Sequence, residues 1–211
     1  MQLAVRAEKS APPAHSAVCE AAAMAVVRLL TDPRSTGGEW YDSVHRWESG
    51  RIRKVTRRAR GARWHAVQEL PGVTVDHAGA QARAFVPGPV TEVPPELAKL
   101  QVAGLDLGDD DASSDPETAP DRPYAAIALN PDVTMTTGKA AAQCGHAAQL
   151  LLLQMDSVEV GAWTAAGLMV HLVRDVPWRD CVERAAVAVQ DAGFTEVPPG
   201  SMTAVSWIVP A

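Results

Sequence analysis

The sequence predicts an α/β protein of two similar units, each with a small mixed sheet in a three-layer α/β/α arrangement. In both halves of the 211 residues, short apolar runs that favour buried strands alternate with longer Ala- and Leu-rich runs that favour helices. Turn-forming residues recur at one offset, because Gly79 and Pro89 lie 121 positions before Gly200 and Pro210. Glycine and proline fix backbone geometry, so this recurrence indicates an internal duplication.

A chance alignment of two α/β segments of similar length is the alternative to duplication. The same offset pairs Gly-Val-Thr at 72–74 with Gly-Phe-Thr at 193–195. An offset of 124 pairs the start of the first long helix with the start of the helix at Gly138, which sets His15 against Lys139 and Cys19 against Gln143. We therefore expect the first copy to have lost the polar residues that the second copy retains.

The N-terminal half carries strand and helix signals in alternation. An Ala-rich run without breakers predicts a long helix, which ends at the Pro-, Gly- and Ser-containing stretch 31–38. Residues 51–56 alternate basic with apolar or β-branched side chains, which favours a strand with one solvated face. The expected elements are a strand at 2–6, a helix at 15–30, a strand at 51–56, a helix at 57–70, strands at 73–75 and 80–86, and a short helix at 94–100.

The C-terminal half repeats this order. The apolar run 125–129 is typical of a buried strand, and a loop with Pro and Thr leads from it into a helix start at Gly138. Gly193 follows a long helical pattern at the position where glycine commonly ends a helix. The expected elements are a strand at 125–129, a helix at 138–153, a turn or helix at 158–163, a strand at 168–174, a helix at 178–190 and a strand at 205–209.

Size and composition fit an ordinary globular protein, with 47% apolar residues. No apolar run approaches the ~20 residues of a membrane span, and the N-terminus lacks the basic and apolar regions of a signal peptide. Three cysteines form neither a CxxC pair nor an even disulfide framework. We therefore expect no membrane association and a location in the reducing cytoplasm.

The net charge of −6 hides an uneven distribution. Residues 1–105 hold fourteen Lys and Arg against ten Asp and Glu, whereas residues 106–122 hold one against seven. The second stretch is also nearly without apolar side chains, which predicts an acidic disordered linker. We therefore divide the chain into a basic N-terminal copy (1–105), this linker (106–122) and a C-terminal domain (123–211).

Lys139 lies in the first turn of the helix that begins near Gly138. A cation there opposes the helix dipole, and the free N–H groups around it suit an anion. Gln143 and His146 follow at i+4 and i+7, so the three side chains share one helix face. The alternative is a lysine that reaches into solvent and a histidine at the edge of the core.

Two stretches of the C-terminal half resemble the signature of the archaeal and eukaryotic type of peptidyl-tRNA hydrolase. The first is D-V-x-M-x-x-G-K-x-A-A-Q-C-x-H-A, from Asp132 to Ala147, and the second is D-A-G-F-T-E-V-P-P-G-S-x-T, from Asp191 to Thr203. Their order matches that of the family, and the resemblance covers residues 123–211. The family's fold is a four-stranded mixed sheet with helices, and some of its members pair.

The resemblance implies hydrolysis of the ester between tRNA and a peptide or N-blocked aminoacyl group. It implies a catalytic site of Lys139, Asp191, Thr195 and Thr203, with no cofactor. We expect the substrate to be contacted by Gln143, His146 and Asp132. From the residues alone, Asp191 is equally explained as a turn residue, and the threonines by strand propensity.

The chemistry of ester hydrolysis needs a positioned water, a proton acceptor and a donor for the oxyanion. The sequence has no HExxH, CxxC or carboxylate cluster for a metal, and no Gly-Xaa-Ser-Xaa-Gly nucleophile motif. The C-terminal half departs from the family's pattern at Asn130, where arginine is usual, and at Phe194, where a basic or polar residue is usual. A non-catalytic RNA- or protein-binding module that kept the fold is therefore the alternative function.

The N-terminal copy carries a dense basic run with tryptophans nearby. Cations interleaved with aromatic residues are able to follow a phosphate backbone and stack on bases, so we expect this run to bind tRNA. A solvated strand and helix face with tryptophans in the core is the alternative. The two copies would form a pseudo-dimer within the chain, or the chain would form a homodimer. The cations expected to contact RNA are Arg51, Arg53, Lys54, Arg57, Arg58, Arg60 and Arg63.

Overall fold

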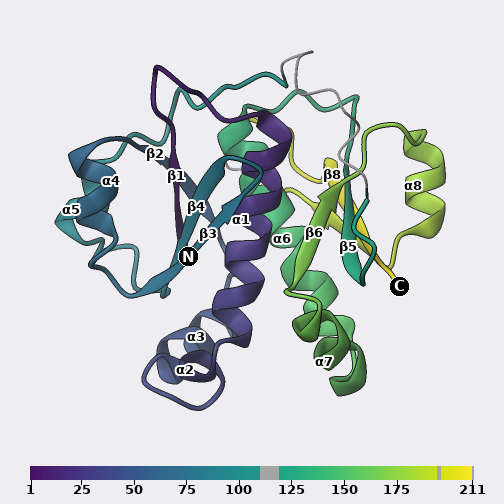
Figure 1. The fold of residues 1–211 in the computed structure, drawn as a ribbon, viewed down its shortest axis with the longest axis horizontal. Helices are drawn as coiled ribbons and strands as arrows, with labels where there is room; N and C mark the ends of the chain where they lie inside the picture. Colours follow the sequence, from purple (N-terminus) through teal and green to yellow (C-terminus); the bar gives the residue numbers. More distant parts are fainter. Residues whose placement is uncertain (110–118, 194–195, 211) are drawn as a thin grey trace.

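The computed structural model describes residues 1–109, 119–193 and 196–210 and shows a mixed α/β protein with two four-stranded mixed sheets (Figure 1). The sheets have the strand orders β2-β1-β4-β3 and β6-β5-β8-β7. In each sheet the two central strands run antiparallel, one edge strand is parallel to its neighbour and the other is antiparallel. Each strand of one sheet therefore has a counterpart in the other, as the predicted two-unit fold requires.

The first unit contains four strands and five helices among the residues described. Its first strand and long helix have almost the bounds that the apolar runs predict. The elements are β1 (Gln2–Arg6), α1 (His15–Thr31), α2 (Pro33–Thr36), α3 (Tyr41–Glu48), β2 (Val55–Ala59), α4 (Ala62–Val67), β3 (Gly72–His77), β4 (Ala80–Phe85) and α5 (Pro95–Ala98).

The second unit contains four strands and three helices among the residues described. Its long helix again follows the first strand, with the capping residue Thr136 just before it. The elements are β5 (Tyr124–Leu129), α6 (Thr137–Gln154), α7 (Ser157–Ala165), β6 (Met169–Leu172), α8 (Trp178–Arg184), β7 (Val187–Gln190) and β8 (Met202–Val209).

Helices cover both faces of each sheet, which confirms the predicted three-layer arrangement. The inner faces pack on α1 and α6 in one large apolar core that draws on both units. The outer face of the first sheet buries Trp64 of α4 and Leu97 of α5, and that of the second buries Cys181 of α8. In Figure 1, α4 and α5 accordingly lie on one side of the molecule and α8 on the other, with α1 and α6 between the sheets.

The two long helices pack against each other at the centre of the molecule. Both are rich in alanine, so their backbones approach closely, and nearly all of α1 is buried. Each helix also reaches the other unit, since α1 contacts β6 and α6 contacts β2. This reciprocity is what a two-fold interface between two similar partners produces. The two units thus meet as a pseudo-dimer, and self-association of the whole chain stays a prediction.

The expected helix at 178–190 is replaced by α8 and the edge strand β7. Val187 and Val189 are buried while Ala188 and Gln190 are exposed, which is the alternation of a strand with one covered face. The apolar residues from Cys181 to Val189 fit a helical face as well, because short apolar runs do not distinguish the two periods. Pairing with β8 decides in favour of the strand.

The basic run also folds differently from the expectation. Its strand, β2, spans 55–59 rather than 51–56, and α4 spans 62–67 rather than 57–70. Arg57 and Arg58 are therefore strand residues whose side chains alternate in direction. Parallel pairing with β1 fixes this register, which the local sequence does not reveal.

The glycine alignment holds in one place and fails in another. Gly79 and Gly200 both lie in the connection before the last strand of their unit, with φ of 77° and 80°. Gly72, in contrast, begins β3, whereas Gly193 lies in the loop after β7. The pairing of Gly72 with Gly193 is therefore incorrect, because the connection between β7 and β8 is longer than that between β3 and β4. Residues 194 and 195 lie outside the described part of the chain.

Asp109, near the beginning of the predicted linker 106–122, contacts both units. The Asp109 carboxylate accepts hydrogen bonds of 2.8 Å from the backbone N–H and the hydroxyl of Ser16, in the first turn of α1. Its other oxygen lies 3.0 Å from an Arg174 nitrogen of the second unit. Residues 110–118 lie outside the described part of the chain, so the prediction of disorder there is untested.

Candidate active site

Two distant segments fix the start of α6, the helix that carries Lys139. The Thr136 hydroxyl accepts a 3.3 Å hydrogen bond from the Lys139 N–H. Glu196, in the loop between β7 and β8, accepts hydrogen bonds from the Thr136 N–H and hydroxyl at 2.9 and 2.8 Å. The Leu105 carbonyl accepts the Gly138 N–H at 3.1 Å. The first turn of α6 is thus held between Leu105, the last residue of the N-terminal unit, and the loop between β7 and β8.

A tight connection after β7 places Asp191. Backbone hydrogen bonds join Asp191 to Ser201 and Gly200 across the hairpin, at 2.9 and 2.7 Å. Gly193 has a φ of 74°, and a Cβ atom there would lie 2.4 Å from Pro199 Cγ. Only glycine fits this position, and the Gly193 N–H donates to the Asp191 carboxylate, which helps to hold that side chain in place.

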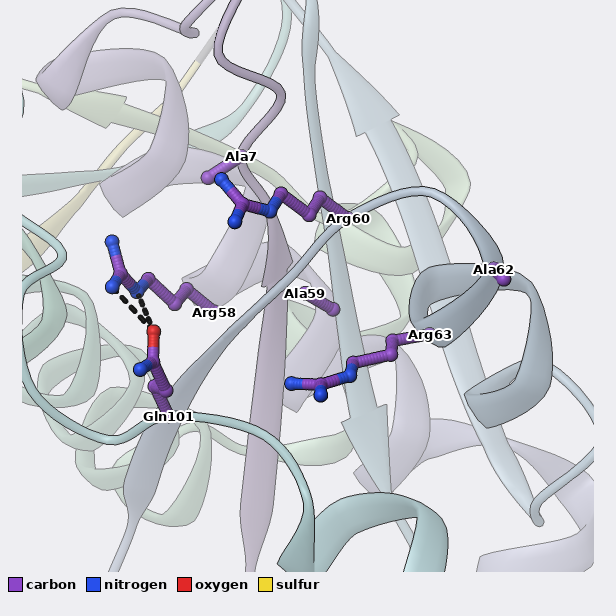
Figure 2. Close-up of a pocket in the computed structure, with 7 residues that line it drawn as sticks. All are labelled: Ala7, Arg58, Ala59, Arg60, Ala62, Arg63 and Gln101. Atoms are coloured by element: carbon purple, nitrogen blue, oxygen red, sulfur yellow. Dashed lines mark hydrogen bonds between the residues drawn. The ribbon is translucent and has the colours of Figure 1, made fainter.

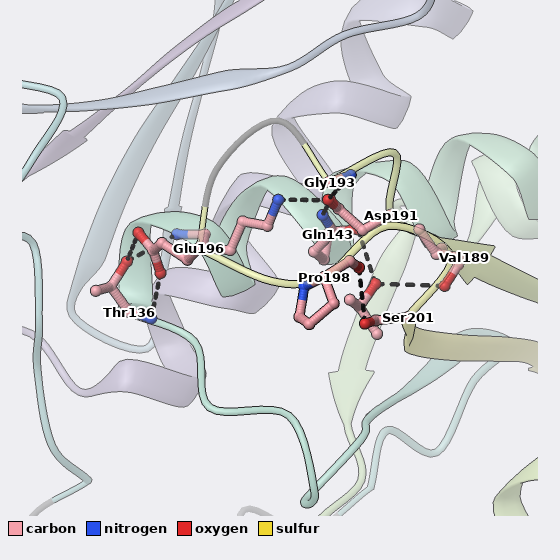
Figure 3. Close-up of polar contacts among 10 residues, drawn as sticks. Thr136, Gln143, Val189, Asp191, Gly193, Glu196, Pro198 and Ser201 are labelled. Atoms are coloured by element: carbon pink, nitrogen blue, oxygen red, sulfur yellow. Dashed lines mark hydrogen bonds and ion pairs between the residues drawn. The ribbon is translucent and has the colours of Figure 1, made fainter.

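Lys139 and Asp191 form an ion pair, although 52 positions separate them in the sequence. Lys139 Nζ lies 2.5 Å from Asp191 Oδ2. The same oxygen accepts a 2.6 Å hydrogen bond from Gln143 Nε2 (Figure 3). The other carboxylate oxygen accepts the Gly193 N–H at 2.8 Å. Thr203 in β8 is fully buried, and its hydroxyl donates to Gln143 Oε1 at 2.9 Å. A connected polar cluster therefore links α6, the β7–β8 loop and β8.

The cluster lies at the edge of the core, because Gln143 and Thr203 are buried while the two charged side chains are slightly exposed. The side chains of Lys139 and Asp191 are 11% and 9% exposed, so solvent reaches both charged groups. Burial raises the pKa of Asp191, but the hydrogen bonds from Lys139, Gly193 and Gln143 outweigh it and bring the pKa below its ordinary value. Asp191 is consequently an anion at neutral pH, which makes it an acceptor of hydrogen bonds.

The predicted site residues divide into three groups. The structure brings Lys139, Asp191, Thr203 and Gln143 together, whereas Thr195 lies outside the described residues. Asp132 is exposed on the loop before α6, and its backbone N–H donates to the Asn130 side chain at 3.0 Å. No described contact joins Asp132 to the Lys139 cluster.

His146 faces the first unit instead of the Lys139 cluster. Its Nδ1 atom lies 3.2 Å from the ammonium of Lys54. Burial and the cation of Lys54 hold the pKa of His146 well below its ordinary value, so the ring is neutral. A spacing of i+7 leaves His146 one turn beyond Gln143, where α6 already packs on the other unit.

Lys54 is a correction to the predicted RNA-binding surface. Its side chain is buried, and its ammonium donates a hydrogen bond to Gln149 of α6. The ring of Trp47 lies 5.0 Å away. Burial lowers the pKa of Lys54 to about 7, partly opposed by Glu48. This lysine joins the two units and is not available to a phosphate backbone.

The six arginines of the basic run lie in different surroundings. Arg51 and Arg53 are exposed before β2. Arg57 donates to the Gln2 side chain at 2.8 Å and to the Leu100 carbonyl at 3.1 Å. The remaining three, Arg58, Arg60 and Arg63, border one hollow of the surface.

A buried carboxylate in α1 is a second polar junction that the sequence motifs do not indicate. Glu20 Oε2 lies 2.8 Å from His77 Nε2 of β3, and Glu20 Oε1 lies 3.4 Å from His171 Nδ1 of β6. The backbone N–H of Leu172 donates to the same carboxylate at 2.7 Å. The sequence feature that could indicate this junction is the single Glu within an Ala- and Val-rich helix. A carboxylate buried in such a helix requires polar partners.

Comparison with known proteins does not place the chain in a family. No protein-family model matches it, and no curated protein is significantly similar to it. Among the described residues, no group of three or more His, Cys, Asp or Glu is arranged to hold a metal ion. None of the helices within 1–109, 119–193 and 196–210 is both long and apolar enough to cross a membrane.

Proposed function

We propose that the second unit hydrolyses the ester bond between tRNA and a peptide or N-blocked aminoacyl group. The observation that supports this most directly is the convergence of Lys139, Gln143, Asp191 and Thr203 from three separate segments. All four belong to the two stretches that resemble the peptidyl-tRNA hydrolase signature. Helical periodicity accounts for Lys139 and Gln143 sharing a face, but not for Asp191 meeting both.

The cluster supplies the groups that ester hydrolysis needs. The Asp191 carboxylate is ionised and accepts a hydrogen bond from the attacking water, while the Lys139 ammonium donates to the oxyanion that forms on the acyl carbon. The water oxygen bonds to that carbon as one water proton passes to the Asp191 carboxylate. The bond between the carbon and the ribose oxygen then breaks, and the ribose oxygen takes up that proton from Asp191 and leaves as a hydroxyl. Gln143, itself held by Thr203, keeps the carboxylate oriented when Lys139 turns toward the substrate.

The translation machinery that produces peptidyl-tRNA works in a reducing cytoplasm. The three cysteines of the chain are all buried and free, which fits that compartment. The partner in this proposal is tRNA, and no cofactor takes part.

The second candidate is a non-catalytic RNA- or protein-binding module. The observation that favours it is the closeness and low exposure of the Lys139–Asp191 pair, which also ties α6 to the β7–β8 loop. A pair in this geometry acts as a structural link when no substrate competes for the ammonium.

Release of peptide from N-blocked aminoacyl-tRNA tests the proposal. We expect the wild-type protein to release the blocked amino acid, and Lys139→Ala and Asp191→Asn to lower the rate by about 10²-fold or more. Lys9→Ala removes an exposed ammonium elsewhere and serves as the matched control. Circular dichroism checks that each variant is folded. No release by the wild type, or undiminished release by folded Lys139→Ala, would leave the binding module as the better description.

A further inference from the structure

A hollow of about 370 Å³ in the first unit gathers three of the seven cations of the basic run. Arg58, Arg60 and Arg63 border it together with Gln101, and the lining contains no carboxylate. Figure 2 shows these side chains extending from β2 (Arg58), from the turn that follows it (Arg60) and from α4 (Arg63). The volume is within the range of small-molecule sites, roughly 300–1,000 Å³.

The hollow lies where the parallel strands β1 and β2 end. Ala7 follows the last residue of β1, and Ala59 ends β2. Ligands of α/β proteins commonly bind outside the carboxyl ends of such strands. The second unit has a hollow of about 310 Å³ at the equivalent ends of β5 and β6, but there Arg174 is paired with Asp109. Only the first of these two hollows has cations without carboxylates in its lining.

The Arg58 guanidinium is already oriented for a ligand. It donates to the Gln101 side-chain oxygen from two nitrogens and to the Gly104 carbonyl at 3.0 Å. A guanidinium has five N–H donors, so two remain for an incoming anion.

The two neighbouring arginines are less constrained. Arg63 donates to the Lys99 carbonyl at 3.1 Å, and Arg60 donates no hydrogen bond to any residue that the structure describes. The nearby carboxylate of Glu8 is held by Arg6 at 3.1 Å and by the Gly61 N–H at 3.0 Å. An anion in the hollow therefore meets donors that are not committed to carboxylates.

One short segment connects the hollow to the start of α6. Gly104 accepts the hydrogen bond from Arg58, and the next residue, Leu105, accepts the one from Gly138. Because the spacing of consecutive Cα atoms is fixed, the Arg58 guanidinium lies within about 15 Å of the Gly138 nitrogen. A stacked nucleic-acid strand advances about 3.4 Å per nucleotide. A phosphate in the hollow and an ester at Lys139 are thus a few nucleotides apart on one strand.

We propose that Arg58, Arg60 and Arg63 form a binding site for a backbone phosphate of the tRNA part of the substrate. The proposal rests on the proposed function for the identity of the RNA. It assigns the RNA contact to these three arginines rather than to the whole basic run. The first unit then holds the nucleic acid while the second unit acts on its ester.

Binding of deacylated, fluorescently labelled tRNA tests this site independently of hydrolysis. The double variant Arg60→Ala/Arg63→Ala is compared with Arg46→Ala/Arg179→Ala, which removes the same charge from exposed positions outside the hollow and outside the basic run. Anisotropy titrations at several salt concentrations give the affinity and its salt dependence. We expect the hollow variant to bind about ten-fold or more weakly, with a salt slope shallower by about 1 to 2. The control pair should stay within about two-fold of wild type.

The outcomes separate this inference from the proposed function. Equal weakening in both double variants, or no tRNA binding by the wild type, would overturn the phosphate site whatever the hydrolysis assay shows. Displacement of tRNA by micromolar AMP or inorganic phosphate would also overturn it, in favour of a site for small free anions. Loss of binding in the hollow variant alone supports the site. If the wild type then releases no peptide, only the proposed reaction fails.

Discussion

The buried lysine between the two units shows how strongly the surroundings of one residue determine its role. Lys54 sits in a basic run, yet its ammonium contacts Gln149 and His146 of the other unit. Burial lowers its pKa from 10.5 to about 7. The unfolded chain therefore binds more protons than the folded chain between these two values, so folding stability rises with pH there.

We predict that this pH dependence disappears in Lys54→Met. Between pH 7 and 9, the free energy of unfolding of the wild type should rise by roughly 1–3 kcal/mol relative to that of the variant. Urea titrations at several pH values measure the difference. Lys9→Met, at an exposed position, should follow the wild type. Parallel curves for the wild type and Lys54→Met would show that the ammonium is charged in the folded protein throughout this range.

At the scale of single elements, the connection between β7 and β8 determines the geometry of the Lys139 cluster. Gly193 and Gly200 both have positive φ, but their surroundings differ. A Cβ at Gly193 would collide with Pro199, whereas a Cβ at Gly200 would meet no atom within 4 Å. Substitution at Gly200 therefore measures the cost of backbone strain alone, whereas substitution at Gly193 adds the cost of a steric collision.

We predict that Gly193→Ala is more harmful than Gly200→Ala. Gly200→Ala serves as the control. It should lower the free energy of unfolding by about 1–2 kcal/mol, which is the usual cost of placing a residue with a Cβ in the left-handed region. Gly193→Ala adds the collision and should also displace Asp191, so that peptide release falls as well. Thermal unfolding and the release assay measure the two effects. Equal losses in both variants would mean that the loop rearranges without moving the carboxylate.

The sequence predicts correctly those elements whose local pattern fits only one type of secondary structure. The strand at 2–6 and the long helices were indicated by uninterrupted apolar or Ala-rich runs between clear breakers. The apolar run near 187 fits the periodicity of a helix as well as that of a strand, and only its pairing with β8 decides for the strand. The local sequence does not show which strands pair with each other. For the same reason it does not predict that β2 spans 55–59 rather than 51–56.

In the candidate site, too, the sequence does not show contacts between distant segments. Lys139 and Gln143 share a face through helical spacing, which the sequence shows directly. The direction of the His146 side chain depends on how α6 packs on the first unit, and the sequence does not show that packing. The Glu196 contact with Thr136 and the Glu20 junction are also long-range, so neither was expected.

At the scale of the whole molecule, the units are joined through their central helices. α1 and α6 share one apolar core, and Glu20 bonds to groups of both sheets. Burial raises the pKa of Glu20, but hydrogen bonds from His171, His77 and Leu172 lower it to about 2, so this junction is charged at neutral pH. Separation of the units would expose both the apolar faces and this carboxylate.

We predict that neither half of the chain folds alone. Residues 1–105 and 123–211, produced separately, should lack near-UV circular dichroism and a cooperative thermal transition, because each would expose an Ala-rich helix face. Produced together, the two pieces should copurify and regain both signals. The full chain is the control. A cooperative, monomeric transition of either isolated piece would show that the shared core is dispensable.

Gly145 bears on how these two halves work together. A Cβ at this position of α6 would lie 3.1 Å from Val26 Cγ2 and 3.2 Å from Lys54 Cδ, closer than an ordinary contact. A methyl group here would force one half to shift relative to the other by a few tenths of an ångström. Such a movement would change the distance between the arginine-lined hollow and the Lys139 cluster without altering a residue of either, so under the proposed function the absent side chain of Gly145 sets the length of RNA between them.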